Sequence, residues 1–387
     1  MEFQLNDLHK QIRDSAGKLA RSFSLGYWLE KDKSESYPWE FVKAFADGGW
    51  LGTIVPEEYG GMGLGITEAV LLLHEIALSG AGMSGASAIH FYMFPPSPVV
   101  HHGSQAMKQK YLPQISKGEL LMAFGVTEPN AGSDTSRIET RAERRGDKWI
   151  INGQKVWTTN AQNAAKILLL TRTSSRSEQR PLDGMTLFFV DLDRERCRVQ
   201  RIDKLGRAAV DSNEVFIENL AAGDEDIVGE VGKGFYHLLD GLNPERIVLA
   251  AEAIGIGRCA LNIAAKYAKE RVVFGRPIGQ NQAVAHPLAK AWMELEAADM
   301  LVFKAAWLCD QGQPCAKEAN SAKYLAAEAA FNACDAALQT LGGFGYAKEF
   351  HVERLWRESR LYKIAPISQQ MVLNFLAQQV LGLPKSY

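Results

Sequence analysis

The pattern of apolar and polar positions divides the chain into three parts. Up to about residue 118, apolar residues recur three and four positions apart, as in EAVLLLHEIALSG, which is the spacing of helices that bury one face. From about 119 to 225 the pattern changes to short runs such as KWIINGQKVWTT and GMTLFFVDLD, separated by Gly, Asn and Asp, which predicts strands. From about 226 to the end the helical spacing returns.

The last part is expected to contain four long helices, over 246–272, about 282–312, 317–341 and 351–382. The first follows the stretch GLNPERIVLA, in which Asn243 is a favoured N-cap and Pro244 suits the first helical position. Glu245 would then lie in the first turn, where a carboxylate complements the helix dipole by roughly 0.3–1 kcal/mol. Local sequence favours this helix-start role, and a second reading is that Glu245 is a base.

Two glycine-rich stretches are interpreted as structural. The loop PEEYGGMGLG (56–65) has neither the spacing nor the strand-to-helix setting of a dinucleotide-binding fingerprint, so we expect a cluster of turns. The stretch AAEAIGIGRCA within 246–272 carries Ala and Gly where neighbouring helices can approach closely. Helix packing is therefore the expected role of its GIG triplet.

Composition narrows the class of protein. Of the 387 residues, 47% are hydrophobic and 23% are charged, as in ordinary globular proteins. A formal net charge of -2 argues against nucleic acid as a principal partner, because phosphate binding needs clustered surplus Lys and Arg. No uninterrupted apolar run is long enough to span a bilayer, so no membrane is expected. With neither a signal-peptide run nor a transit-peptide composition at the N-terminus, cytoplasmic localisation is the expectation.

Few residues are candidates for catalysis or metal binding when each motif is considered by itself. Five cysteines form no CxxC pair and are expected to be idle thiols. His101 and His102 are adjacent and so do not face one site, and no metal-binding site is expected. The turn-rich stretches FGVTEPNAGSD (124–134) and VWTTN (156–160) can hydrogen-bond to and stack on a flat heterocycle, although Trp157 read locally is more often a core aromatic.

Taken together, five motifs give the chain a resemblance to the acyl-CoA dehydrogenase family of flavoproteins. They run in the family's order, and the resemblance as a whole covers roughly residues 5 to 380. The motifs are VPEEYGGMGLG (55–65), VTEPNAGSD (126–134), INGQKVWTTN (151–160), ERVVFGRPIGQNQ (270–282) and LGGFGY (341–346).

The resemblance implies an α+β fold that is mainly α, and it names the three parts. Residues 1–118 become an N-terminal helical bundle, 119–225 a middle β-barrel-like domain, and 226–387 a C-terminal four-helix bundle. FAD is expected between the middle and C-terminal domains. Members of the family are usually homotetramers, sometimes dimers, and one subunit helps to bind its neighbour's FAD.

The resemblance also assigns cofactor residues. Trp157 and Thr159 should flank the isoalloxazine edge, with the Thr159 hydroxyl near N5. An Arg suits the pyrophosphate, and glycines let backbone N–H groups approach it. The positions expected to face the flavin or the CoA thioester are Phe124, Val126, Thr127 and Ser133, with Ser368 and Gln370 on the flavin side. The positions expected to hold the ADP portion are Arg271, Phe274 and Gln282, together with Gln339, Gly342 and Gly343 contributed by a partner subunit.

Family chemistry is α,β-dehydrogenation of an acyl-CoA, in which a carboxylate removes the α-proton while a hydride leaves the β-carbon for flavin N5. Many members carry that carboxylate in a Tyr-Glu-Gly-Thr motif after a segment similar to WRESRLYKI (356–364). Here APISQQ follows, and Pro366 occupies the place of the Glu. A second branch, similar to isovaleryl- and long-chain acyl-CoA dehydrogenases, carries its Glu in the helix matched by NPERIVLA. The resemblance therefore assigns the base to Glu245.

Substrate contacts are expected at Tyr236, Asn243 and Arg246, and Asn243 replaces an Asp that is common in the family. In relatives the backbone N–H at the position of Pro366 helps to hold the thioester oxygen, and proline has no N–H. Losing one such donor typically costs about 2.7–4 kcal/mol. Either a neighbouring donor substitutes, the alignment shifts by one residue, or the substrate differs.

The first functional hypothesis is an FAD-dependent acyl-CoA dehydrogenase with Glu245 as base and an electron-transfer flavoprotein as acceptor. A base on this helix hints at branched or longer acyl chains. A related flavoprotein oxidase, or an enzyme acting on an atypical substrate, is the alternative. A flavin- or CoA-binding protein without turnover is a third reading, supported mainly by Pro366.

Overall fold

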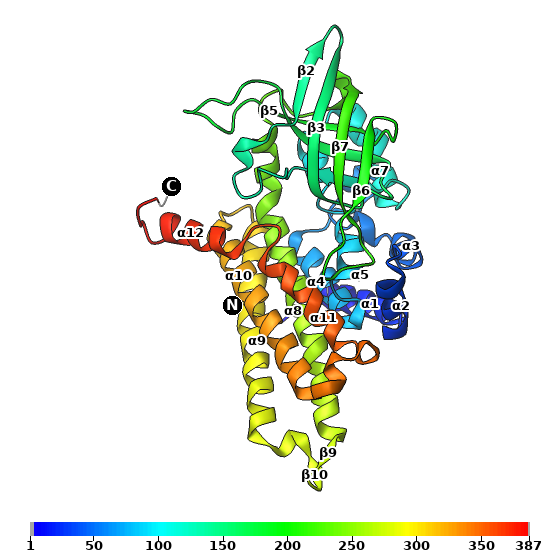
Figure 1. Cartoon of the computed structure of the whole chain (residues 1–387), viewed down its shortest axis with the longest axis vertical. Helices are drawn as coiled ribbons and strands as arrows, with labels where there is room; N and C mark the ends of the chain where they lie inside the picture. Colours follow the sequence, from blue (N-terminus) through cyan, green and yellow to red (C-terminus); the bar gives the residue numbers. More distant parts are fainter. Residues whose placement is uncertain (1–3, 386–387) are drawn as a thin grey trace.

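The computed structural model of the chain describes residues 4–385, and its three parts follow the predicted order of helices, strands and helices. In Figure 1 the strands of the middle part lie at the top, the first helices pack below them, and the long helices of the last part run to the bottom. The mainly helical α+β fold predicted from the sequence is confirmed. The helices of the first part are α1 (Asp7–Arg21), α2 (Leu25–Ser34), α3 (Trp39–Asp47), α4 (Ile66–Ile76), α5 (Gly82–His90), α6 (Ser97–His102) and α7 (Gln105–Ser116).

The middle part is one twisted sheet with strand order β6-β7-β3-β2-β4-β5-β8, in which β1 pairs with β4. Every residue of β4 is buried, which explains its nearly continuous apolar run KILLLTR. The long strand β3 pairs antiparallel with β7, and its register shifts between Lys155 and Thr158. The strands are β1 (Met122–Gly125), β2 (Arg141–Arg145), β3 (Lys148–Thr159), β4 (Lys166–Arg172), β5 (Met185–Asp191), β6 (Cys197–Arg201), β7 (Ser212–Ala222) and β8 (Ile227–Val228).

The last part is a bundle of long helices, α8, α9 and α10, followed by two shorter ones, α11 and α12. A two-stranded hairpin joins α8 to α9 at the bottom of Figure 1. The elements are α8 (Gly234–Glu270), β9 (Val272–Val273), β10 (Arg276–Pro277), α9 (Gln282–Asp310), α10 (Ala316–Leu341), α11 (Val352–Ser359) and α12 (Gln369–Gln379).

The start of α8 corrects the sequence prediction. The helix begins at Gly234, so Asn243 and Pro244 lie inside it, and Glu245 is not in its first turn. The extra turns are held by packing: Leu238 is buried, and a side chain at Gly234 would press against the backbone of β5. Asn243 is therefore not an N-cap, and the helix dipole gives Glu245 no support.

The predicted helix over 351–382 is also wrong as a single element. Helix α11 ends at Ser359, a 3₁₀ turn covers Arg360–Lys363, and α12 begins only at Gln369. Pro366 lies in the break, where a proline prevents the preceding residue from continuing a helix and removes a backbone donor. The Ser368 hydroxyl caps α12 by accepting from Met371 N–H at 3.4 Å.

Both glycine interpretations hold in the structure. A Cβ at Gly255 would collide with the backbone oxygen of His74 on α4, and one at Gly257 would come within 3.1 Å of Ala330 Cα on α10. The GIG triplet thus lets three helices pack closely. The 56–65 loop is a series of turns around a 3₁₀ turn at Glu57–Tyr59, and a Cβ at Gly61 would collide with the Val55 backbone.

Two apolar segments are explained by core packing. By length and hydropathy alone, Ile66–His90 and Gly234–Glu270 are apolar enough to cross a membrane, but 89% and 83% of their most apolar windows are buried inside the fold. The five cysteines are free thiols. Within residues 4–385 no group of three or more His, Cys, Asp or Glu side chains has the arrangement of a metal site.

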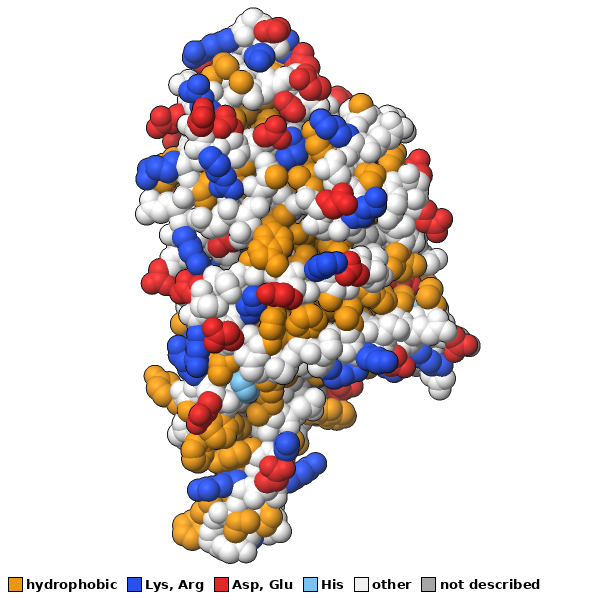
Figure 2. Space-filling model, turned by 90° about the vertical axis from the view of Figure 1, so that its right-hand side faces the viewer, with side chains coloured by type: hydrophobic (Ala, Val, Ile, Leu, Met, Phe, Trp, Pro, Cys, Tyr) orange, Lys and Arg blue, Asp and Glu red, His pale blue; other side chains and the backbone are white. Residues whose placement is uncertain are grey.

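Exposed apolar side chains gather at the lower end of the molecule. Figure 2 shows such side chains at the foot of the bundle and across the face above it. Phe274 in the β9–β10 hairpin is 100% exposed, and Tyr346 after α10 is 83% exposed. Trp292 and Met293 on α9 are also exposed. Several large apolar side chains exposed at one end of a molecule are typical of an interface.

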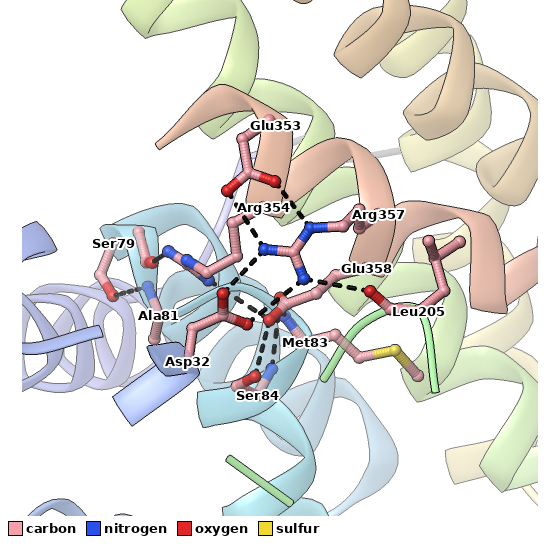
Figure 3. Close-up of polar contacts among 11 residues, drawn as sticks. Asp32, Ser79, Ala81, Met83, Ser84, Leu205, Glu353, Arg354, Arg357 and Glu358 are labelled. Carbon is pink, nitrogen blue, oxygen red and sulfur yellow. Dashed lines mark hydrogen bonds and ion pairs between the residues drawn. The ribbon is translucent and has the colours of Figure 1, made fainter. Parts of the chain in front are cut away.

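A buried set of charges, which we call the domain clamp, ties the three parts together (Figure 3). It consists of Asp32 on α2 and Glu353, Arg354, Arg357 and Glu358 on α11. The Glu358 carboxylate accepts from Met83 N–H at 2.7 Å and from the Ser84 hydroxyl at 2.6 Å, and so holds the start of α5.

Arg357 extends the clamp to the other two parts of the chain. Its guanidinium donates to Asp32 Oδ2 at 2.7 Å, to Glu353 Oε2 at 2.6 Å and to the Leu205 carbonyl at 3.1 Å. Arg354 donates to the Gly80 carbonyl at 2.5 Å. One helix of the last part is thereby bonded to the first helices and to the loop between β6 and β7.

Candidate active site

Glu245 lies in α8 with a carboxylate that has no hydrogen bond or ion pair to any of the described residues. The side chain keeps some accessible surface, but the surrounding protein is dense enough that burial raises its pKa above the ordinary value of 4.5. His90 and Arg246 act in the opposite direction, and Glu252 adds to the increase. A carboxylate that is partly dry, unpaired and reachable has the properties of a general base.

The break before α12 lies against α10, close to Arg246 of α8. Lys323 on α10 donates to the Ile367 carbonyl at 2.6 Å, and burial together with nearby Arg246 lowers the pKa of Lys323 to about 8. Arg246 donates to Asn243 Oδ1 at 2.9 Å, which is the role Asn243 has instead of capping the helix. Pro366 itself is exposed at this junction.

Tyr236 lies at the edge of this region. Its hydroxyl donates to Asp183 Oδ1 at 2.8 Å, in the loop before β5, and this hydrogen bond raises the pKa of Tyr236. Seven residues separate Tyr236 from Asn243, which places both on one face of α8, whereas the nine residues to Glu245 turn that side chain to the opposite face. The structure thus groups Tyr236 with Asn243 rather than with Glu245.

The end of β3 is shaped by a bulge that turns Trp157 outward. Trp157 has a φ of 60° and is 57% exposed, so the core reading of this residue is wrong. A positive φ is unusual for a bulky residue, and bulges of this kind re-aim side chains near functional sites. Thr159, two residues later, is buried at 6% exposure and points to the inner side.

Arg207 is a site residue that the sequence reasoning missed. It is 7% exposed, and its guanidinium donates to Thr159 Oγ1 at 3.2 Å, Ser212 Oγ at 2.9 Å and Ser87 Oγ at 3.4 Å. Thr159 Oγ1 accepts from Arg207, and none of the described residues accepts its own hydrogen, so this hydrogen is available to a ligand. Arg207 follows no apolar period and lies in a loop between strands, so the sequence carries no local signal for it.

Arg207 belongs to a buried group where all three parts of the chain meet, which we call the central polar cluster. Burial lowers the pKa of Arg207, and the carboxylates of Asp211 and Glu252 act in the opposite direction. Glu252 in turn is bonded to His90 and Tyr362. The cluster therefore joins the end of β3 to the helix that carries Glu245. Its members are Ser87, His90, Thr159, Arg207, Ser212, Glu252 and Tyr362.

The loop after β1 is held by a buried ion pair that sequence reasoning also missed. Lys155 is inaccessible and contacts Glu128 Oε1 at 2.7 Å and the Val126 carbonyl at 3.1 Å. Glu128 also accepts from Glu139 N–H at 2.6 Å. Because this pair fixes the loop, Phe124, Val126 and Thr127 are presented beside the end of β3. Ser133, further along the loop, is exposed.

The residues predicted for the ADP portion lie at the other end of the molecule. Arg271 follows Glu245 by 26 residues in and just after α8, which corresponds to roughly 39 Å along the helix axis. Gly342 and Gly343 end α10 beside this end of α8, as the contact of the Tyr267 and Phe344 rings at 6.5 Å shows. One chain thus places two halves of the predicted FAD site far apart. The other members of the distant half are Phe274, Gln282 and Gln339.

Several observations fit an FAD at these two surfaces. At the end of β3, Thr158 Oγ1 and both amide atoms of Asn160 are buried without a partner, and Gln369 Nε2 is unpaired at the start of α12. Near the hairpin, a Cβ at Gly342 or Gly343 would meet only open space, so the backbone there can approach a phosphate. Buried polar atoms without partners are rare and call for a ligand or a functional reason. Gln370 is exposed next to them.

Comparisons with known proteins agree over almost the whole chain. Three family profiles match in succession: "Acyl-CoA dehydrogenase, N-terminal domain" over residues 6–119, "middle domain" over 123–220 and "C-terminal domain" over 232–381. The acyl-CoA dehydrogenase fadE12 of Mycobacterium bovis is 38% identical over 97% of this chain and 96% of its own. A 3-(aryl)acrylate reductase of Clostridium sporogenes is 37% identical over 94% of this chain and 97% of its own.

Solved structures give the same result. The glutaryl-coenzyme A dehydrogenase complex with glutaryl-CoA is 30% identical, with a TM-score of 0.93 over 100% of this chain and 98% of that one. A chain in a solved structure titled "Electron transferring flavoprotein of Acidaminococcus fermentans: Towards a mechanism of flavin-based electron bifurcation" is 31% identical, with a TM-score of 0.93 over 98% of this chain and 100% of that one.

Proposed function

The chain belongs to the acyl-CoA dehydrogenase family of FAD-linked oxidoreductases, and from that premise we propose that it dehydrogenates the α,β-bond of an acyl-CoA thioester with Glu245 as the base. The observation that supports this most is the state of the Glu245 carboxylate. It is partly dry, its pKa is raised by burial, and it has no bonded partner among the described residues. Those properties suit the uptake of a proton from carbon, which typically contributes 10²–10⁴-fold to a rate.

The residues around the cofactor would act as follows. FAD, when bound, accepts the hydride from the β-carbon. Trp157 offers an exposed ring for the edge of the flavin, and Thr159, held by Arg207, offers a hydroxyl hydrogen. Ser368 and Gln370 would lie on the flavin side at the start of α12.

A nearby side chain would replace the backbone N–H donor that Pro366 lacks. Gln369 is 8% exposed, and its Nε2 group is buried without a hydrogen-bond partner. It lies three residues beyond Pro366, at the first position of α12. We take its amide N–H as the substitute donor to the thioester oxygen. An unpaired donor costs about 1–3 kcal/mol when buried, which a bound carbonyl would recover.

The two distant halves of the predicted FAD site argue for more than one copy of the chain. Arg271 lies roughly 39 Å along α8 from Glu245. One FAD molecule is too short to contact both of these regions in the same subunit. We propose a homotetramer, in which the hairpin of one subunit reaches the ADP portion held at its neighbour, with a dimer as the smaller alternative. Light scattering of the FAD-loaded protein would measure the mass directly.

An electron-transfer flavoprotein is the proposed acceptor of the electrons. The support is family membership, together with the similar chain from the structure whose title concerns an electron transferring flavoprotein. The alternative is that the reduced flavin passes its electrons directly to oxygen, so that the protein would be an oxidase. Turnover with an electron-transfer flavoprotein under nitrogen, compared with peroxide release in air, separates these two.

The function is tested by anaerobic mixing of the FAD-loaded protein with straight, branched and aromatic acyl-CoAs while the oxidised-flavin absorbance is followed. We expect rapid bleaching by one chain class, which names the substrate, and a loss of at least about 100-fold in Glu245→Gln. If no acyl-CoA bleaches a flavin that dithionite can reduce, dehydrogenation of thioesters is wrong.

Pro366 and the 3-(aryl)acrylate reductase relative favour one second candidate, the reverse reaction on an aryl-substituted acrylate. A free aryl acrylate has a carboxylate in place of a thioester, so it would not need the thioester-oxygen donor that is missing at Pro366. The test is oxidation of the dithionite-reduced enzyme by aryl acrylates as free acids and as CoA esters. Reoxidation by the free acids, with no bleaching by acyl-CoAs, would support this second function over the first.

A further inference from the structure

Lys323 on α10 is a buried lysine without a counter-charge. It is 2% exposed, and no carboxylate of residues 4–385 lies within ion-pair distance of its Nζ. Lys155, in contrast, is similarly buried but is paired with Glu128 at 2.7 Å. An unpaired buried charge destabilises a fold, and its replacement by an apolar side chain is often neutral or stabilising. A role other than stability is therefore expected for Lys323.

The amino group of Lys323 bonds to the turn between α11 and α12. It donates to the Ile367 carbonyl at 2.6 Å. Pro366 has no N–H, and among the described residues this carbonyl is the one backbone group of Pro366 and Ile367 with a hydrogen-bond partner. Figure 1 shows α12 next to the upper end of α10. Lys323 thus holds the turn to the bundle at a point where the backbone of the turn holds itself poorly.

The turn leads directly into the donor assigned above. Gln369, two residues after Ile367, is the first residue of α12 and is 8% exposed, and its Nε2 has no partner. Ser368 lies between them and caps α12 with its hydroxyl. Because the helix begins immediately after the turn, a movement of Ile367 carries the Gln369 side chain with it. The contact at Ile367 therefore determines where an otherwise unheld amide lies.

We propose that Lys323 is a positioning residue for thioester activation, which holds the Ile367 carbonyl and thereby keeps the Gln369 amide where the thioester oxygen binds. The proposal rests on the function proposed above, in which Gln369 replaces the donor that Pro366 lacks. Lys323 itself contacts neither the substrate nor the flavin. The lysine is retained, although its burial destabilises the fold, because the rate depends on the place of the turn.

A second link between the same two elements offers a matched control. Lys363, in the 3₁₀ turn after α11, forms an ion pair with Glu328 of α10 at 2.7 Å, and both side chains are partly exposed. Glu328 follows Lys323 by five residues, so the two links use different faces of α10. Lys363→Met removes this link without affecting the Ile367 carbonyl.

The first measurement compares stability with turnover. Lys323→Met removes the charge and keeps a side chain of similar length, so we expect the FAD-loaded variant to melt no lower than the unmodified protein. Its kcat, with the acyl-CoA that bleaches the flavin fastest, should fall at least about tenfold, because a displaced donor no longer stabilises the developing oxyanion. Its KM should stay within about threefold, since this donor acts mainly in the transition state. Lys363→Met should keep kcat within about twofold.

The second measurement is the infrared carbonyl band of a bound acyl-CoA that has sulfur at the β-position and an isotopic label at the carbonyl carbon. A hydrogen bond to the thioester oxygen lowers the frequency of this band. We expect this lowering to be lost in Gln369→Leu, largely lost in Lys323→Met and kept in Lys363→Met. The double variant of Lys323→Met and Gln369→Leu should be no slower than Gln369→Leu alone, because both changes act through one group.

The outcomes separate this inference from the proposed function. If Lys323→Met fails to fold, or keeps both its kcat and its carbonyl band, Lys323 is structural and the proposal is wrong. Losses that multiply in the double variant would also overturn it. If no acyl-CoA bleaches the flavin, the proposed function fails, and hydrogen exchange of residues 366–372 then decides. Faster exchange in Lys323→Met than in Lys363→Met supports Lys323 as the anchor of the turn, and equal exchange overturns it.

Discussion

The domain clamp and the central polar cluster both bury charges where the three parts of the chain meet, and they differ in how their polar atoms are paired. In the clamp, Glu358 accepts from Met83 N–H, the Ser84 hydroxyl and Arg354, and Arg357 donates to three different groups. Among its described side chains, one polar atom, Arg354 Nε, is buried without a partner.

The active-site region leaves many more groups open. Beside the unpaired Glu245 carboxylate, buried atoms without partners occur in Thr158, Asn160, Arg207, Arg246 and Gln369. Trp157, Asn160 and Arg207 also have φ values of 60°, 64° and 58°. Unpaired buried polar atoms cost about 1–3 kcal/mol each, and strained backbone costs a similar amount. The clamp therefore fixes the arrangement of the three parts of the chain. The site, in contrast, has hydrogen-bonding groups without protein partners, and these groups are available to a ligand.

Breaking the clamp should have the largest effect on stability. Glu358→Gln leaves Arg354 buried without a counter-charge and turns an acceptor of two N–H groups into a partial donor, so we expect a loss of about 3–5 kcal/mol. Thermal unfolding of the FAD-loaded protein measures it, with the exposed Glu349→Gln as control. Activity per folded, FAD-loaded molecule should stay within about threefold of the unmodified protein. A stable but inactive Glu358→Gln would place this residue in the site instead.

The site region also contains a fully paired set of charges, the Lys155–Glu128 ion pair. Its contribution to stability should depend on pH. Burial raises the pKa of Glu128, but Lys155 and the Glu139 N–H outweigh it and hold that pKa below 4.5. The folded pKa is depressed, so Glu128 contributes stability above about pH 4.5 that is lost as the pH falls through the folded pKa. Lys155→Met should cost about 3 kcal/mol at pH 7 and make the loss of stability in acid shallower.

Thermal unfolding between pH 7 and pH 3 checks this prediction. Lys148→Met is the matched control, because Lys148 lies on the same strand and is exposed. If both variants lose stability in acid as steeply as the unmodified protein, the pair does not stabilise the Glu128 carboxylate.

Arg207 tests whether the central polar cluster acts on the flavin. A buried cation next to Thr159 favours negative charge on the reduced cofactor, so Arg207→Met should lower the flavin midpoint potential. We expect at least a tenfold change in the equilibrium constant of reduction, which is about 30 mV for a two-electron couple. Equilibrium titration against a reference dye measures it. Arg198→Met, at an exposed arginine of β6, should leave the potential in place.

The smallest stability effect is expected at Trp157. Because its ring is 57% exposed, Trp157→Phe should change the free energy of unfolding by less than about 0.5 kcal/mol, yet alter the visible spectrum of bound FAD. Trp28, which is 1% exposed and packs on Phe41, is the contrasting position, where Trp28→Phe should cost about 1 kcal/mol or more. An unchanged flavin spectrum in Trp157→Phe would place this ring away from the cofactor.

The sequence predicted well the features that depend on a repeated spacing of residues. The spacing of apolar residues located the helical and strand regions, and Gly255 and Gly257 were correctly read as packing residues. The start of α8 was predicted wrongly because a strong local signal, Asn243 before Pro244, lost to packing of Leu238 and Gly234 against other elements. Tertiary contacts of this kind have no local signature.

The candidate site shows the same division. Glu245 was found through resemblance to a family, since its neighbourhood in the sequence favours a helix start. Arg207, His90 and Glu252 were not found, because they lie far apart in the chain and no periodicity connects them. The local sequence alone favoured a core position for Trp157, because aromatic side chains are usually buried, and only the resemblance assigned it to the flavin; a bulge in β3 turns the residue outward.

The most direct test of the central claim, that the unpaired Glu245 is the base, is α-proton exchange in D₂O. An acyl-CoA with sulfur at the β-position has no β-hydride to lose, so exchange at its α-carbon reports the base without the redox step. We predict exchange by the unmodified protein and by Glu358→Gln, and a rate at least about 100-fold lower in Glu245→Gln. Exchange that persists in Glu245→Gln would contradict the account.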